Sequence, residues 1–134
     1  MPTELSFDIV HHFDQGLPGI TVPVTLELGA SEAHCETKLD TGCTHCVFRR
    51  AIGETLGLDI ESGQHQEFGS VSGNLVKAYG HWVTLSVLGM QFDSMVYFAA
   101  DPYFKRNLLG RHGFLDRVIL GLIDHDGTLF LNRL

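Results

Sequence analysis

The tripeptide Asp40-Thr41-Gly42 is the sequence feature that most constrains this chain. It ends a segment, 33–39, in which small or apolar side chains alternate with polar ones, the period-two pattern of a strand with one buried face. An acidic residue directly after such a strand, followed by a small hydroxyl residue and a glycine, forms a loop that presents a carboxylate. Gly42 lacks a Cβ and therefore allows two backbones to approach closely. We interpret Asp40 as the chemical centre of the chain.

The sequence on either side of this loop predicts mainly strands. Alternation over 20–28 indicates a strand that forms a hairpin with 33–39, and Pro23 on its outer face indicates an edge or bulge position. A glycine and an asparagine between the extended runs 64–70 and 75–87 predict a second hairpin. Further strands are expected at 91–98, 118–123 and 128–134, a short helix at 49–58 and a helical turn at 114–117.

Together with Leu108-Leu109-Gly110-Arg111, the tripeptide resembles the motifs of the retroviral-type aspartic proteases, the retropepsins. The resemblance runs in order over roughly residues 20–131. It implies an all-β, single-domain, retropepsin-like acid-protease barrel, half of a pepsin-like bilobal fold, with one or two short helices. Residues 20–134 would form the protease domain, and residues 1–19 an N-terminal arm or interface strand.

The same resemblance implies roles for individual residues. Asp40, Thr41 and Gly42 would form the catalytic loop, in which Gly42 also hydrogen-bonds the substrate backbone. The hairpin tip Val71-Ser72-Gly73-Asn74 would be the flap that closes over the substrate. Leu109, Gly110 and Arg111 would thread behind the catalytic loop and support it.

One position departs from the family's pattern. Retropepsins commonly carry an acidic residue two positions after the glycine of the motif, where it supports the arginine; here that residue is Thr44. We therefore expect either that Arg111 pairs with Asp116 or another acid, or that the loop is less rigid.

A single Asp-Thr-Gly in a chain of 134 residues carries a further implication. The chain is too short for two lobes, so an aspartic protease built from it must be a homodimer whose two-fold axis passes between Asp40 and its symmetry mate. The resemblance implies an aspartic endopeptidase that activates water by general acid/base catalysis, acts on a peptide or protein and needs no cofactor or metal. The alternative is a non-catalytic dimerisation or peptide-binding module on the same fold.

Composition and charge exclude several other classes. Nine Lys and Arg stand against 16 Asp and Glu, a net charge of −7, so we expect no nucleic-acid partner. No stretch approaches the ~18 consecutive apolar residues of a membrane span, so we expect no membrane partner. Glu4 and Asp8 do not fit a signal peptide, and an odd number of cysteines argues against a disulfide framework. We expect a cytoplasmic location.

Cys43-Thr44-His45-Cys46 offers a third and weaker reading. A Cys-x-x-Cys with an internal histidine can bind zinc or cycle as a redox pair. A zinc site needs a second pair of ligands, and none occurs at ordinary spacing. We therefore expect cysteines that pack, although oxidation of Cys43 beside Asp40 would close the site.

Overall fold

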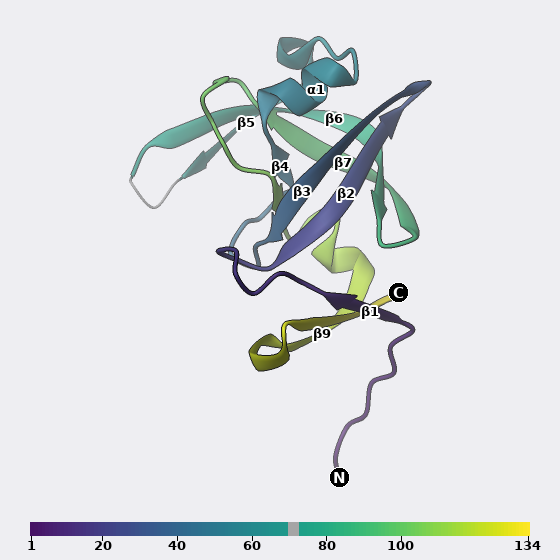
Figure 1. Cartoon of the computed structure of the whole chain (residues 1–134). Helices are drawn as coiled ribbons and strands as arrows, with labels where there is room; N and C mark the ends of the chain where they lie inside the picture. The colour runs from purple at the N-terminus through teal and green to yellow at the C-terminus, as the bar shows by residue number, and fades with distance from the viewer. Residues whose placement is uncertain (70–72) are drawn as a thin grey trace.

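The protein folds into a closed barrel with a small sheet beneath it. The structure, a computed structural model, describes residues 1–69 and 73–134. Within these residues, seven strands form one sheet in the order β2-β3-β8-β4-β7-β6-β5, and three form another in the order β1-β10-β9. β2 also pairs with β6, which closes the larger sheet on itself. The small sheet lies at one end of the barrel and α1 at the other (Figure 1).

The strands are β1 (Ile9–His12), β2 (Thr21–Leu28), β3 (Ser31–Leu39), β4 (Val47–Phe48), β5 (Gln64–Gly69), β6 (Leu75–Val87), β7 (Met90–Ala99), β8 (Leu108–Leu109), β9 (Val118–Ile123) and β10 (Thr128–Arg133). The helical elements are α1 (Arg50–Thr55) and the 3-10 helices η1 (Ile60–Ser62), η2 (Leu115–Arg117) and η3 (Asp124–Asp126). Strands therefore dominate, as the sequence predicts.

The first hairpin, β2–β3, follows the predicted alternation. Val22, Val24 and Leu26 of β2 point into the core, because the apolar face of each strand must be removed from water. The β2–β6 ladder runs over 24–27 of β2, so Pro23 lies just outside it. A proline has no backbone N–H to donate, and a position at the end of a ladder accommodates this lack. The predicted edge position of Pro23 is confirmed.

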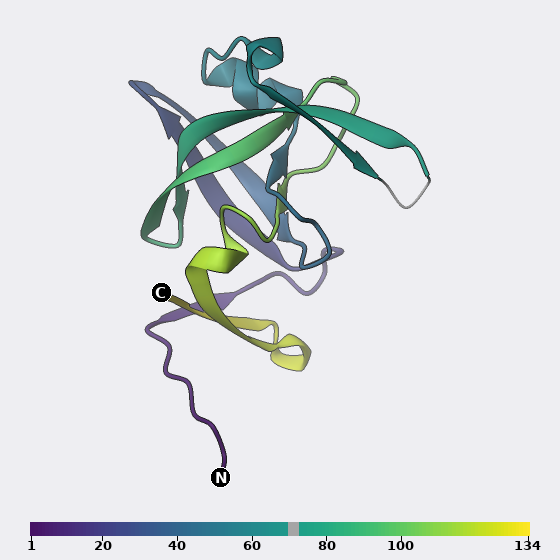
Figure 2. The ribbon, with the colours of Figure 1, turned by 180° about the vertical axis from the view of Figure 1, so that it is seen from behind.

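The second hairpin, β5–β6, extends from the barrel toward the side where β3 ends (Figures 1 and 2). Its register pairs Phe68 with Val76, which places these two apolar side chains opposite each other. The predicted flap residues Val71 and Ser72 lie outside the described residues. Gly73 has a φ of +83°, a conformation that glycine adopts without strain.

The helix α1 is shorter than predicted, ending at Thr55 rather than Leu58. Gly57 has a φ of +80°, and this left-handed residue stops the helix. Gly53 packs α1 closely onto the barrel, since a Cβ there would come within 2.9 Å of the Phe98 ring. The predicted turn at 114–117 is the 3-10 helix η2.

The N-terminal segment contributes a strand to the chain's own small sheet. β1 pairs antiparallel with β10, with Ile9 opposite Leu131. Phe13, Leu129 and Leu131 belong to the same buried cluster as the barrel residues, so the small sheet and the barrel share one hydrophobic core.

None of the helices in the described part of the chain is both long and apolar enough to pass through a lipid bilayer.

Candidate active site

The Asp40 carboxylate is held at the end of β3 by its own loop. The Asp40 N–H donates to the carbonyl of Leu109 at 2.9 Å, which ties the start of the loop to β8. The Gly42 N–H donates to Asp40 Oδ1 at 2.9 Å, and the Cys43 N–H donates to the Asp40 carbonyl at 3.2 Å. These bonds form a turn of the kind that aspartate side chains stabilise. The carboxylate, half-buried, is therefore fixed in orientation.

The segment around Gly110 runs directly behind this loop. β8 pairs with β3 on one side and with Val47 of β4 on the other. The Arg111 N–H donates to the Cys43 carbonyl at 2.9 Å. A Cβ on Gly110 would overlap the carbonyl oxygen of His45 and come within 2.7 Å of that of Cys43. Glycine is thus required at 110, and the structure brings Leu109 and Gly110 together with Asp40.

Arg111 does not make the ion pair that was one of the two expectations for it. Among the described residues, its exposed guanidinium has neither an ion pair nor a hydrogen bond. Asp116 instead accepts a hydrogen bond from the Gly113 N–H at 3.1 Å and lies 3.5 Å from His112 Nδ1. Asp116 contacts Arg111 through its backbone instead: the Asp116 N–H donates to the Arg111 carbonyl at 2.9 Å. The Asp116 carboxylate is therefore not paired with the Arg111 guanidinium.

Thr41 and Gly42 lie at the exposed end of the loop. Within the described part of the chain, the Thr41 hydroxyl makes no hydrogen bond. Gly42 lines the pocket beside Asp40. Of the predicted flap residues, Gly73 and Asn74 are exposed and lie just before β6.

An apolar pocket of about 280 Å³ opens next to Asp40. Its walls come from four parts of the chain: the Asp-Thr-Gly loop with β4, the two strands of the β5–β6 hairpin, the loop before β8, and β8 itself. Sequence reasoning missed most of these walls, because only the register of the hairpin and the closure of the barrel bring them together. The lining residues are Asp40, Gly42, Cys43, Val47, Phe68, Gly69, Val76, Phe104, Arg106 and Leu108.

Two histidines lie behind the pocket. The ring centroids of His45 and His112 are 5.4 Å apart, and the His45 ring also packs on Tyr97 at 4.9 Å and on Phe68 at 5.5 Å. Burial, followed by the nearby His112, lowers the pKa of His45. The His45 ring therefore supports the pocket from behind through its contact with Phe68, which lines it.

Both thiols of the Cys-x-x-Cys contact backbone carbonyls. Cys43 Sγ donates to the His45 carbonyl at 3.0 Å, and Cys46 Sγ donates to the His112 carbonyl at 3.7 Å. Burial raises the pKa of both thiols, that of Cys46 to about 12. Redox and metal-binding cysteines need the opposite shift. Among the described residues, no group of three or more His, Cys, Asp and Glu is placed to hold a metal ion.

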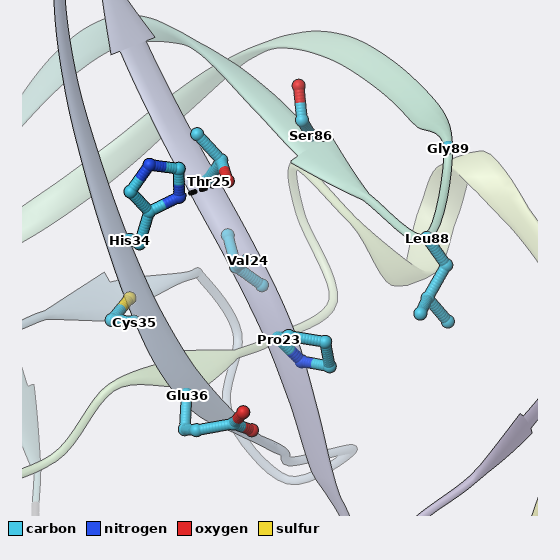
Figure 3. A pocket seen from close by; sticks show the side chains of 9 residues that line it. All are labelled: Pro23, Val24, Thr25, His34, Cys35, Glu36, Ser86, Leu88 and Gly89. Atoms are coloured by element: carbon cyan, nitrogen blue, oxygen red, sulfur yellow. Dashed lines mark hydrogen bonds between the residues drawn. The ribbon is translucent and has the colours of Figure 1, made fainter.

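A larger depression, about 500 Å³, lies elsewhere, on the outer surface of β2 and β3 (Figure 3). Thr25 and His34 hydrogen-bond to each other there at 2.8 Å. None of the motif residues lines this depression. The smaller pocket beside Asp40 is therefore the better candidate for an active site.

A barrel with an Asp-Thr-Gly loop at the end of one strand, a glycine segment threaded behind it and an extended hairpin beside an apolar pocket defines the acid-protease class of folds. The model of the aspartyl protease family matches residues 22–122, more than half of the chain. The chain belongs to this family.

Solved structures agree with this assignment. A retropepsin-like aspartic protease from Rickettsia conorii superposes with a TM-score of 0.66 at 17% identity, covering 96% of this chain and 100% of that one. The EIAV protease, solved in complex with the inhibitor HBY-793, superposes with a TM-score of 0.52 at 22% identity, covering 68% of this chain and 80% of that one. The predicted all-β, single-domain retropepsin-like fold is confirmed. No match was found among curated proteins.

Proposed function

We propose that the chain is one half of an aspartic endopeptidase, a homodimer in which two copies of Asp40 form one catalytic dyad. The observation that carries this proposal is the Asp40 carboxylate, fixed by the Gly42 N–H at the edge of an apolar pocket. The chain contains a single Asp-Thr-Gly. A dyad therefore requires a second copy of the chain.

The proposed chemistry follows from placing two carboxylates about 3 Å apart, where both cannot ionise cheaply. One carboxylate stays charged and takes a proton from a bound water, while the other donates its proton to the scissile carbonyl. The roles exchange as the amide leaves. Gly42 hydrogen-bonds the backbone of an extended substrate, and Thr41 of each chain contacts the opposite loop. The apolar pocket accepts a hydrophobic side chain.

The second chain is proposed to approach from one side of the molecule. The end of β3, the end of β5 and the turn between β9 and β10 all lie on the same side (Figures 1 and 2). Near that turn Leu122 and Ile123 are 44% and 46% exposed. Exposed apolar side chains on an edge strand are typical of surfaces that become buried on association.

The experiment that tests the proposal is cleavage of a diverse peptide pool, from mildly acidic to neutral pH, by wild type and Asp40→Asn. We expect wild type to cut between apolar residues, with a bell-shaped pH profile. We expect Asp40→Asn to lose at least about 10²–10⁴-fold in rate, the usual share of acid–base catalysis. Mass spectrometry of the products measures both rates and gives the specificity.

Asp59→Asn is the matched control, because Asp59 is exposed and makes no side-chain hydrogen bond in its position before η1. This variant should cleave like wild type. Equal cleavage by wild type and Asp40→Asn would contradict the dyad. No cleavage by wild type that is folded and dimeric would favour the binding module.

A further inference from the structure

A second, cationic pocket lies next to the apolar one. It has a volume of about 160 Å³, and four of the nine Lys and Arg of the chain line it. Such a concentration is unexpected in a chain with a net charge of −7. The lining residues are Thr21, Glu36, Thr37, Lys38, Arg49, Lys105, Arg106 and Asn107.

Asn107 holds the three segments that supply the cations. The Lys38 N–H of β3 donates to the Asn107 carbonyl at 2.9 Å, and the Arg49 N–H donates to Asn107 Oδ1 at 2.9 Å. Lys105 and Arg106 directly precede Asn107 in the chain. The Lys38 stem lies over Gly19, since a Cβ there would be 3.1 Å from Lys38 Cδ. The pocket is therefore built on fixed backbone rather than on a mobile surface.

The cations of this pocket are not paired with acidic side chains of the described part of the chain. Among the described residues, none of the four makes an ion pair, although Glu36 also lines the pocket. The Arg49 Nε is buried and has no hydrogen-bond partner within that part of the chain. A buried donor without an acceptor costs free energy that a bound acceptor would recover. The neighbouring Arg50, in contrast, is paired with Glu54 and Glu61.

Arg106 connects this pocket to the candidate active site, because it lines both. A peptide that places one side chain in the apolar pocket continues past Arg106. Because the two pockets share this wall and an extended chain advances about 3.3 Å per residue, side chains close together in one peptide can occupy both pockets. Guanidinium groups bind carboxylates through charge-assisted hydrogen bonds, which are stronger than neutral ones.

We infer that the cationic pocket is a subsite for an acidic side chain of the substrate, within two residues of the apolar side chain bound beside Asp40. This inference rests on the proposed function, because it assigns a specificity to the same cleft. The enzyme therefore selects peptides in which an aspartate or glutamate accompanies a hydrophobic residue at the scissile bond.

The test uses short peptides, blocked at both ends, with a central pair of leucines and a single Glu at each position within two residues of that pair. Each peptide has a matched partner with Gln in place of Glu. At about pH 5.5 the Glu side chain is ionised. Because both ends of the peptide are blocked, this side chain is its only carboxylate. We expect wild type to prefer the Glu peptide in kcat/KM by on the order of tenfold at one position, a difference of about 1.4 kcal/mol.

Arg106→Gln and Arg49→Gln should bring this preference close to unity. Arg106 is exposed, so its replacement leaves the core intact and the loss is not one of folding. Lys77→Gln is the control for net charge, because Lys77 is exposed and lines neither pocket. It should retain the preference. Added salt should weaken the preference in wild type, since ions screen exposed charges.

Equal cleavage of Glu and Gln peptides at every position would overturn the subsite and leave the protease intact. Cleavage of no peptide would contradict the proposed function instead. In that case the subsite is tested by binding: calorimetry measures the affinity of the same peptides for Asp40→Asn. Tighter binding of a Glu peptide, lost in Asp40→Asn combined with Arg106→Gln, would support it. Equal or absent binding would overturn it.

Discussion

At the scale of single residues, His45 links acidity to the stability of the candidate site. Its ring packs between Tyr97, Phe68 and His112, and burial lowers its pKa from the ordinary value of 6.5. His112 in turn lies 3.5 Å from the Asp116 carboxylate. The unfolded chain takes up a proton at His45 near pH 6.5, whereas the folded chain resists it. Stability contributed by neutral His45 is thus present above pH 6.5 and is lost as the pH falls below it.

We therefore expect the melting temperature of wild type to fall more steeply between about pH 7 and pH 5 than that of His45→Gln, which cannot be protonated. Differential scanning calorimetry over this range measures the effect. His125→Gln, at an exposed histidine of η3, should follow wild type. Parallel curves for wild type and His45→Gln would contradict the role of His45.

The cysteine environments give a second prediction at this scale. Burial raises the pKa of Cys46 to about 12 and of Cys35 to about 11, and it raises that of Cys43 as well. The thiolate is the reactive form, so alkylation of the native protein at about pH 8 should be at least about tenfold slower than that of free cysteine. Mass spectrometry of the labelled peptides measures each site.

Denaturant should release all three thiols to the ordinary rate of alkylation. Cys46, which is fully buried, should react only after unfolding. Rapid labelling of Cys43 and Cys46 in the folded protein would instead support the redox reading.

At the scale of elements, the Asp-Thr-Gly loop depends on β8 and Gly110, which pass directly behind it. Gly110→Ala would force a methyl group into the carbonyls of His45 and Cys43, which belong to the loop itself. Because backbone cannot move aside as a flexible side chain does, we expect a loss of at least about 2 kcal/mol in the free energy of unfolding. Urea denaturation measures it.

Gly69→Ala is the matched control for this prediction. Among the described residues, a Cβ at Gly69 meets nothing within 4 Å, and the φ of Gly69 is not in the left-handed region. Its unfolding free energy should stay within about 0.5 kcal/mol of wild type. If the unfolding free energy of Gly110→Ala also stayed this close to wild type, the loop would accommodate a side chain at 110 and the prediction would be wrong.

At the scale of the whole molecule, the proposed active site exists only in the dimer. We expect the activity per mole of chain to fall on dilution through the dissociation constant of the dimer. Ile123→Asp, on the side proposed to face the second chain, should weaken the dimer by on the order of tenfold or more, because it places a charge in an apolar contact. Analytical ultracentrifugation and activity at matched concentrations measure both.

Trp82→Asp is the control, since Trp82 is 62% exposed and lies beside the β2–β3 turn at Gly29, away from the proposed contact. Its dimerisation should equal that of wild type. Full activity of a chain shown to be monomeric would contradict the dyad.

The local sequence pattern was sufficient to predict much of the fold. Period-two alternation predicted most strands and the hairpin that delivers Asp40, because one face of each strand must be buried. The Asp-Thr-Gly loop and the Gly110 segment that packs behind it were recognisable from their motifs alone. Glycine and proline marked turns and an edge position for the same local steric reasons.

The tertiary structure decided which side chains meet. Val47, Phe68 and Leu108 line one pocket, although they come from three distant segments. Arg49 and Arg106 are likewise distant in sequence, yet both line the cationic pocket. The sequence by itself determined the strands and the motif, since these depend on neighbours in the chain. Only the folded barrel decided the pockets and the partner of Asp116, because register and closure set the distances between residues far apart in sequence.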